Sequence, residues 1–101
     1  MKRGELWWAR LDKRRPVLLL SRDEAYDVRA MVTVAPLSTT IRGFSVEVRV
    51  GRKEKLPKVC VVNLDNVATI AMASLEERIS VLSTSKMAQV DDSLRFALGL
   101  E

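Results

Sequence analysis

The sequence predicts a mainly β fold, a small antiparallel β-barrel with one C-terminal α-helix. Three observations predict it. Short apolar runs separated by polar turns follow one another as far as Leu82. The segment Phe44–Val50 alternates between apolar and polar side chains, which is the period of a half-exposed strand. From Ser85 to Leu98 the apolar residues instead recur at helical spacing, so one helix should pack against a strongly curved sheet.

Four strands are predicted in the first half of the chain, at Leu6–Leu11, Pro16–Leu20, Met31–Ala35 and Phe44–Val50. Successive strand side chains alternate, so Trp7 and Trp8 point to opposite faces and at least one should lie in the core. The second run is apolar at every position, as expected of a strand covered on both faces. A helical turn is expected within Ser21–Asp27. We expect Pro36 to end the third strand and to open a loop over Leu37–Gly43.

The second half begins with a basic turn and has three further predicted strands, at Val59–Leu64, Val67–Met72 and Ile79–Leu82. The basic turn covers Gly51–Pro57. Ser74 and Glu77 have the spacing of a capping box, which predicts a short helical turn beginning at Ser74. The final helix should end at Gly99, since glycine commonly follows the last helical residue. Its apolar stripe consists of Met87, Val90, Leu94 and Leu98.

Length and composition limit the classes of function. A chain of 101 residues with 48% hydrophobic residues predicts one domain, residues 1–101, with an ordinary core. No apolar run approaches the roughly 20 residues that span a bilayer, and no secretion signal is evident, so a cytoplasmic location is expected. The single cysteine, Cys60, excludes an intramolecular disulfide, and the absence of histidine excludes histidine acid–base catalysis. We predict neither a metal site nor a cofactor.

Charge is unevenly distributed along the chain. Residues 1–58 carry fourteen Lys and Arg against seven Asp and Glu, a balance of +7, whereas residues 59–101 carry three against six, a balance of −3. Such asymmetry indicates an anionic partner for the first half, and nucleic acid is the commonest one for a soluble domain. A solvated surface whose two halves mix in space fits the same charges equally well.

Three groups in the basic half could carry chemistry. Lys13-Arg14-Arg15 directly precede Pro16 and could hold phosphates, because arginine offers a planar fork to phosphate oxygens. The hydroxyl-rich loop at Pro36–Gly43 could bind a phosphate and orient a ribose hydroxyl. Arg49–Lys58 could form an electrostatic rail for RNA. Taken alone, each group fits a structural role better: a strand that ends at the surface, a turn former and a solvated loop.

Candidate RNA contacts follow from these groups. They are Lys13, Arg14, Thr39, Thr40, Arg42 and Asn66. Asn66, which follows an apolar strand, fits a turn at least as well. Tyr26 is the best exposed candidate for base stacking, since the other aromatic residues look buried.

The order of these motifs resembles the MazF/PemK family of toxin–antitoxin ribonucleases over nearly the whole chain. The matching segments are Arg3–Ala9, Arg15–Ser21, Val34–Thr40, Val62–Ile70 and Ala97–Leu100. The resemblance implies a CcdB/PemK-like barrel, similar to the Src-homology fold, and a homodimer. It implies a toxin that cleaves single-stranded RNA (mRNA, tRNA or rRNA) at a short sequence without a metal and so inhibits translation and growth. The products would be a 2′,3′-cyclic phosphate and a 5′-hydroxyl, and an acidic antitoxin protein would silence the toxin.

The resemblance also assigns catalytic residues. The arginine and threonine of the family correspond to Arg15 and Ser38, and the serine keeps the hydroxyl while losing a methyl group. The adjacent Thr39 is an alternative for that role. Because an arginine stays protonated at neutral pH and is a poor proton donor, Arg15 is expected to act as an electrostatic clamp. The loop between the first two strands, Asp12–Arg14, is shorter than in many members of the family. The short loop predicts a more open RNA-binding groove.

Two other functions fit parts of the pattern. A gyrase poison of the CcdB kind shares the barrel, but it relies on a C-terminal tryptophan, and both tryptophans here are N-terminal. A non-catalytic RNA-binding barrel is consistent with the serine at position 38 and with the short first loop. A nuclease assay separates this second alternative from the ribonuclease.

Overall fold

The computed structural model describes all residues 1–101. Its strands are β1 (Glu5–Arg10), β2 (Arg14–Leu19), β3 (Met31–Ser38), β4 (Glu47–Val50), β5 (Cys60–Asn63), β6 (Ala68–Ala71) and β7 (Leu75–Val81). Its helices are α1 (Ala25–Val28) and α2 (Thr84–Leu98), and three 3₁₀ turns are η1 (Arg52–Glu54), η2 (Leu64–Asn66) and η3 (Met72–Ser74). The predicted mainly β fold with a C-terminal helix is confirmed.

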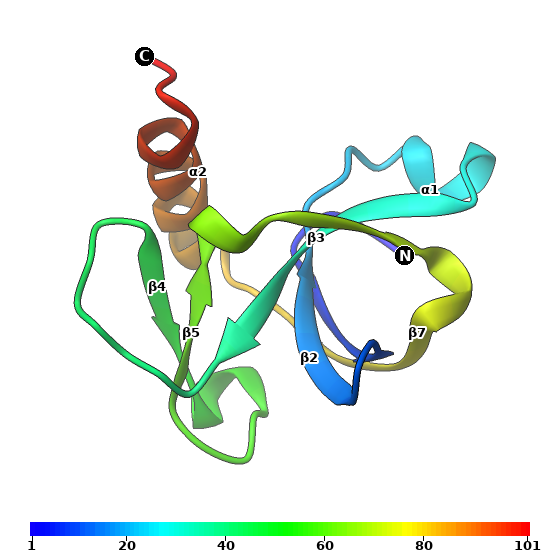
Figure 1. The fold of residues 1–101 in the computed structure, drawn as a ribbon, viewed down its shortest axis with the longest axis horizontal. Coiled ribbons are helices and arrows are strands. Elements are labelled where there is room, and N and C mark those ends of the chain that lie inside the picture. Colours follow the sequence, from blue (N-terminus) through cyan, green and yellow to red (C-terminus); the bar gives the residue numbers. More distant parts are fainter.

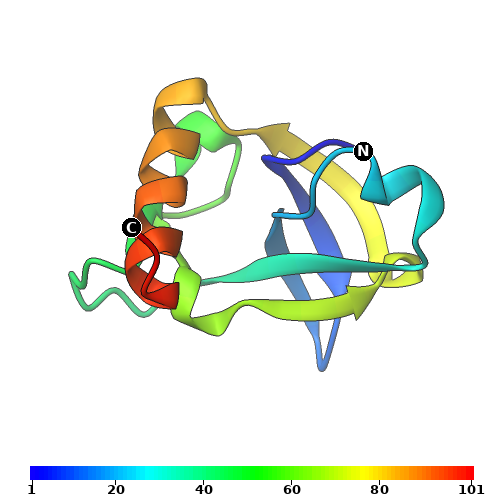
Figure 2. The ribbon, with the colours of Figure 1, turned by 90° about the horizontal axis from the view of Figure 1, so that it is seen from above.

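The strands form one antiparallel sheet that curls into a half-barrel (Figure 1). The strand order is β4-β5-β3-β2-β1-β7, and β6 pairs with the first part of β3. Seen from above, α2 lies along one end of the curled sheet (Figure 2). A hydrogen bond links the last strand of this path to the turn that follows β4, since the hydroxyl of Ser80 on β7 donates to the carbonyl oxygen of Glu54 in η1 at 2.6 Å.

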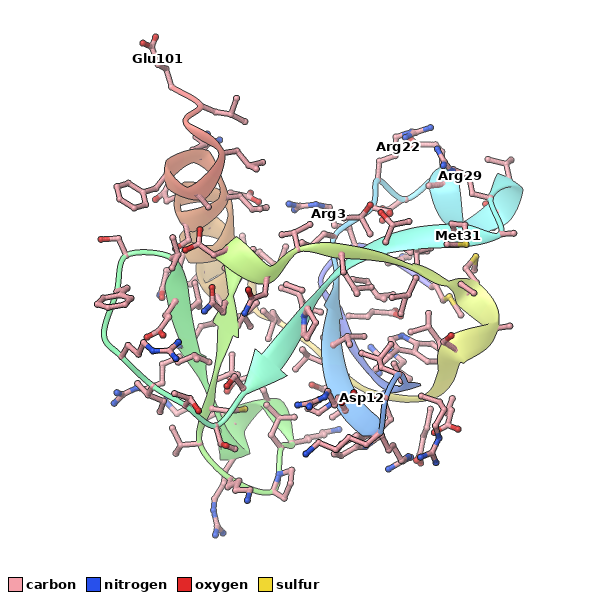
Figure 3. The ribbon with its side chains drawn as sticks, viewed as in Figure 1. Arg3, Asp12, Arg22, Arg29, Met31 and Glu101 are labelled. Atoms are coloured by element: carbon pink, nitrogen blue, oxygen red, sulfur yellow. The ribbon has the colours of Figure 1, made fainter.

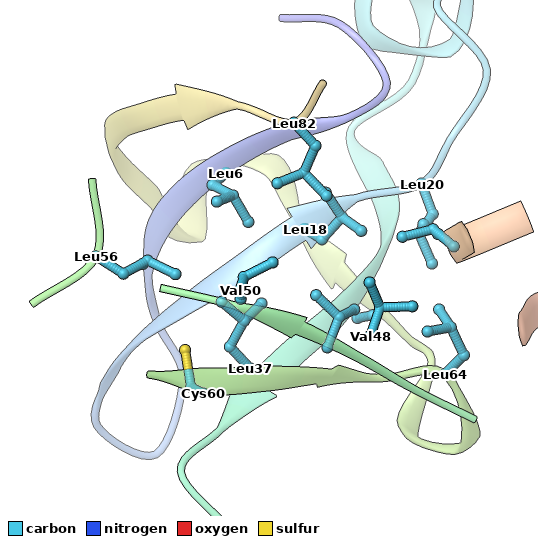
Figure 4. Packing of buried hydrophobic residues seen from close by; sticks show 13 residues of the cluster. Leu6, Leu18, Leu20, Leu37, Val48, Val50, Leu56, Cys60, Leu64 and Leu82 are labelled. Carbon is cyan, nitrogen blue, oxygen red and sulfur yellow. The ribbon is translucent and has the colours of Figure 1, made fainter. Parts of the chain in front are cut away.

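Two clusters of buried side chains lie on the two faces of β2. Leu18 and Leu20 belong to the larger cluster, which contains 13 residues (Figure 4), and Val17 and Leu19 belong to a second cluster of six. The alternation confirms that this apolar run is covered on both faces. Full burial of a valine or leucine side chain contributes roughly 1.5–3 kcal/mol, so β2 is a central source of stability.

Helix α2 closes the larger cluster. Val90 is fully buried, and Met87, Leu94 and Ala97 pack against the same cluster. Ser83 caps the first turn by accepting a hydrogen bond from the amide of Lys86 at 3.1 Å, and Gly99 ends the helix at φ +69°. Leu98, expected on the buried stripe, is 61% exposed. Ala97 packs against the core instead, since positions 87, 90, 94 and 97 lie on one face of a regular helix.

Pro36 does not end β3, contrary to the expectation, and the strand continues to Ser38. On one side Pro36 pairs with Val17 of β2. On the other side it lies between the segment paired with β6 and the segment paired with β5, where no residue is registered opposite it. A missing amide is tolerated at such a gap in the ladder.

The predicted strand Phe44–Val50 is only half formed, because β4 begins at Glu47. The Glu47 carboxylate accepts hydrogen bonds from the amides of Arg42 at 3.0 Å and Gly43 at 2.8 Å, which folds the preceding residues into a loop. Gly43 takes φ +77° in that loop. Phe44 is consequently 62% exposed instead of lying on the core face.

The helical turn predicted from Ser74 and Glu77 is wrong. Ser74 is the last residue of η3, and Glu77 lies in β7 opposite Trp8. Pairing along the whole of β1 satisfies the backbone of β7, and such long-range pairing overrides a local capping pattern. The brief strand expected at Ile79–Leu82 is therefore part of a longer one.

Candidate nucleic-acid groove

A hollow of about 480 Å³ lies where β2 begins, and we call it the groove. The residues that line it are Trp8, Lys13, Arg14, Arg15, Pro16, Leu37, Ser38, Thr39, Thr40, Leu56, Pro57, Lys58 and Cys60. Four of them are cations and none is an acid. The groove thus contains the basic run Lys13–Arg15 and part of the hydroxyl-rich loop Pro36–Gly43. It also contains Lys58, the last residue of the basic stretch Arg49–Lys58.

Sheet register brings these segments together. The β1–β2 turn is tight, since Arg10 pairs with Arg14 and the amide of Leu11 donates to the carbonyl of Lys13 at 3.1 Å. Pairing of Val17 with Pro36 sets the beginning of β2 beside the end of β3. Pairing of β3 with β5 then adds the residues before β5, which include Lys58.

Arg15 is held by Asp12 from the same turn. Its Nε lies 3.1 Å from Oδ1 of Asp12 and its Nη2 lies 3.3 Å from Oδ2, so the two planar groups meet side by side. The hydrogen bond with Asp12 raises the pKa of Arg15, and the same bond lowers the pKa of Asp12. Arg15 is therefore a permanent, oriented positive charge and a poor proton donor.

Ser38 faces the same groove at the end of β3. Its Oγ accepts a hydrogen bond from the amide of Thr40 at 3.1 Å. This contact fixes the oxygen and leaves the hydroxyl proton free for a ligand. Thr39 and Thr40 also line the groove and are more exposed than Ser38.

The remaining groove cations differ in their surroundings. Arg14 lies over the ring of Trp8 and forms ion pairs with Glu76 and Glu77. Lys13 and Lys58 are exposed, and neither is among the ion pairs of the molecule.

Not every predicted contact residue reaches the groove. Arg42 and Asn66 do not line it: the amide of Arg42 binds the Glu47 carboxylate, and Asn66 ends η2, beyond the far end of β5. The expectation that Tyr26 is exposed is wrong, because only 7% of the residue is accessible. Its hydroxyl donates to the carbonyl of Ser21 at 3.0 Å, and burial raises its pKa to about 12.

Sequence reasoning missed the rest of the lining. The sequence pattern indicates no site role for Trp8, and Lys58 belongs to a basic stretch that fits a solvated loop. In the structure Lys58 alone of that stretch's cations lines the groove. Cys60 also lines it, but burial raises the pKa of its thiol, so the thiol is no ready nucleophile. No sequence signal could have separated Lys58 from its neighbours, because only the pairing of β5 with β3 selects it.

The comparisons with known proteins converge on one family. The family model described as PemK-like, MazF-like toxin of type II toxin–antitoxin systems matches residues 2–98. The chain belongs to this family. Its MazF/PemK relatives include the probable endoribonuclease MazF2 of Mycobacterium tuberculosis H37Rv, 38% identical over 101 residues, covering 98% of this chain and 99% of the relative. The probable endoribonuclease MazF5 of the same strain is 37% identical over 99 residues, 95% of this chain and 91% of the relative.

Solved structures agree with this assignment. The Mycobacterium tuberculosis toxin MazF-mt6 superposes with a TM-score of 0.92 at 36% identity, covering 96% of this chain and 98% of that one. A mycobacterial endoribonuclease in complex with its cognate antitoxin gives a TM-score of 0.89 at 25% identity, covering 100% and 97% of the two chains. The resemblance noted in the sequence and the predicted fold are both confirmed.

Two further findings concern metal binding and membrane-spanning helices. No group of three or more His, Cys, Asp or Glu side chains gathers in a way that could hold a metal ion. No helix is both long enough and apolar enough to cross a membrane.

Proposed function

We propose that this chain is the toxin of a type II toxin–antitoxin system and a sequence-specific endoribonuclease that cleaves single-stranded RNA without a metal ion. One observation carries the proposal. Arg15 and Ser38, which match the catalytic pair of the MazF/PemK family, line the same groove among four cations and no carboxylate. The relatives that are 37% and 38% identical carry the name endoribonuclease. Residues 1–101 act as one domain, since β2 contributes to both core clusters.

The reaction proposed is an internal transfer at phosphorus. The ribose 2′-oxygen attacks the adjacent phosphorus, the O2′–P bond forms and the P–O5′ bond breaks. The 2′-hydroxyl loses its proton and the leaving 5′-oxygen gains one, which gives a 2′,3′-cyclic phosphate and a 5′-hydroxyl. Arg15 stabilises the charge that develops on the phosphoryl oxygens, and the Ser38 hydroxyl donates a hydrogen bond to one of them. DNA, which has no 2′-hydroxyl, would not be cut.

The test is a cleavage assay on mixed-sequence RNA in excess EDTA with mapping of the new 5′ ends. We expect discrete cuts with 5′-hydroxyl ends from the wild-type protein, and much slower appearance of the same cuts with Arg15→Ala and Ser38→Ala. The same sequence made as DNA should stay intact. Binding without any cleavage of mRNA, tRNA or rRNA would replace the nuclease with a non-catalytic RNA-binding barrel. An Arg15→Ala variant that cuts at the wild-type rate would remove Arg15 from the mechanism.

The partner proposed for the groove is an acidic antitoxin segment that orders on binding. Charge complementarity supports it, since the exposed Lys13 and Lys58 lie in an acid-free lining. Its affinity should therefore fall as salt is added, and an affinity indifferent to salt would contradict a shared groove. A homodimer in the cytoplasm, where RNA is available, completes the proposal, and light scattering on the purified protein measures the dimer.

A further inference from the structure

One wall of the groove is a stacked pair, Trp8 and Arg14. The guanidinium carbon of Arg14 lies 4.6 Å from the centre of the Trp8 ring, within the range of a cation–π contact. Both residues line the groove. The indole N–H of Trp7 is used inside the protein, where it donates to Glu5 at 2.9 Å, whereas no protein acceptor binds the indole N–H of Trp8. Of the two tryptophans, Trp8 is the one at the ligand side.

Arg14 is fixed in this position by two glutamates. Its Nε lies 3.1 Å from Glu76 and its Nη2 lies 3.0 Å from Glu77. Because β1 lies between β2 and β7, the Arg14 side chain reaches them across β1, and there it lies over the Trp8 ring. A register shift in the β1–β7 pairing, between Trp8 and Ala9, marks the bulge at which two consecutive glutamates face one cation.

This arrangement makes Arg14 a poor phosphate ligand. Two carboxylates already compensate its single charge, and a phosphate at the same place would meet both of them at close range. The side chain is 39% exposed, so Arg14 remains open to a ligand that stacks on its guanidinium plane. Nucleobases stack on arginine planes and on aromatic rings in RNA complexes.

We propose that the Arg14 guanidinium, held over the Trp8 ring by Glu76 and Glu77, is a stacking platform for one nucleobase of the RNA in the groove. The identity of the ligand rests on the proposed function, but stacking requires no cleavage. The role differs from the phosphate contact that the sequence suggests for Arg14. Phosphate contacts then fall to Arg15 and to the unpaired Lys13 and Lys58. Because every base has a flat face, the platform orders the strand without choosing its sequence.

The test distinguishes the contribution of the planar Arg14 guanidinium from that of its positive charge. Arg14→Lys keeps the positive charge and loses the plane. Arg10→Lys is the matched control, because Arg10 contacts the same Glu76 at 3.5 Å but does not line the groove. The probes are a labelled 2′-O-methyl RNA oligonucleotide, which cannot be cleaved, and a series in which one nucleotide at a time is abasic. Fluorescence anisotropy measures the Kd of each pair, and cleavage of unmodified RNA by the wild-type protein is measured in parallel.

We expect one abasic position to weaken wild-type binding by about tenfold, a usual size for one stacked base. Arg14→Lys should bind the intact oligonucleotide about tenfold more weakly and be indifferent to that abasic position, while Arg10→Lys behaves as wild type. Equal Kd values for Arg14→Lys and wild type, or the same abasic penalty in both, would overturn the platform even if RNA is cleaved. Binding with the predicted pattern but no cleavage would overturn the nuclease and keep the platform. A wild-type protein that binds no RNA would overturn both.

Discussion

The two ends of β2 carry two hollows that look alike in composition and differ in construction. The groove lies at the start of β2, and a smaller hollow of about 270 Å³ lies just past its end, lined among others by Ser21, Arg22, Arg29, Thr33 and Thr69. Figure 3 shows Asp12 at one end of the strand and Arg22 and Arg29 at the other. Both hollows thus contain arginines and hydroxyl groups, and neither is lined by an acid.

The difference lies in how the side chains are held. In the groove Arg15 is oriented by two contacts with Asp12, and the Ser38 hydroxyl keeps its proton free. In the second hollow Arg22 and Arg29 are exposed and form no ion pair, while the Ser21 hydroxyl oxygen serves the fold by accepting from the Thr33 amide at 2.8 Å. Catalysis by charge depends on donors that are already oriented, so composition alone does not distinguish a site from a surface.

The largest difference in activity should appear when one arginine at each end of β2 is replaced by glutamine. Arg15→Gln removes the oriented charge at the phosphate, and we expect kcat to fall about 10²–10³-fold. Arg22→Gln removes a positive charge that no ion pair orients, and it should leave kcat unchanged. Single-turnover cleavage of a short RNA measures both. Equal losses in the two variants would mean that general positive charge, not the groove, drives the reaction.

The two serines should separate activity from stability. Ser38→Ala removes a hydrogen-bond donor from the groove and should slow cleavage about tenfold or more, with a small change in melting temperature. Ser21→Ala leaves the Thr33 amide without its acceptor and should cost about 1–2 kcal/mol of stability with kcat unchanged. Thr39→Ala tests the alternative hydroxyl. If Thr39→Ala slows cleavage more than Ser38→Ala, the catalytic hydroxyl belongs to Thr39.

The sequence predicts the groove better than the strand boundaries around it. The order of short motifs along the chain places Arg15 and Ser38 at one site, and both line the groove, whereas Arg42 and Asn66 do not. Pro36 and the Ser74–Glu77 pair are misjudged, since strand pairing decides their conformation and is invisible locally. Trp8 and Lys58 are missed for the same reason: only the curl of the sheet carries them to the groove.

Tyr26, near the second hollow, should report on the fold and not on the reaction. Its pKa is raised from 10.0 to about 12, so the neutral hydroxyl is favoured in the folded state. The stability that this provides is present below pH 10 and is lost as the pH rises from about 10 towards 12. Tyr26→Phe should lose about 1 kcal/mol of stability at pH 7 and show a smaller alkaline loss than wild type, with cleavage unchanged. Urea unfolding at pH 7 and pH 11 measures this, and an equal alkaline loss in both proteins would assign it to another group.

Asp12 should have the smallest and most specific effect, because it both orients Arg15 and opposes an incoming phosphate. The pair persists across the neutral range, since the hydrogen bond between them lowers the pKa of Asp12 and raises the pKa of Arg15. Asp12→Asn keeps the shape of the side chain and an acceptor oxygen but removes the charge. We expect a few-fold lower Kd for an uncleavable RNA at low salt, a difference that shrinks as salt is added, together with a few-fold lower kcat because Arg15 is less firmly oriented. A weaker affinity instead would show that the Asp12 carboxylate itself contacts the RNA, and an unchanged kcat would show that Arg15 needs no orienting partner.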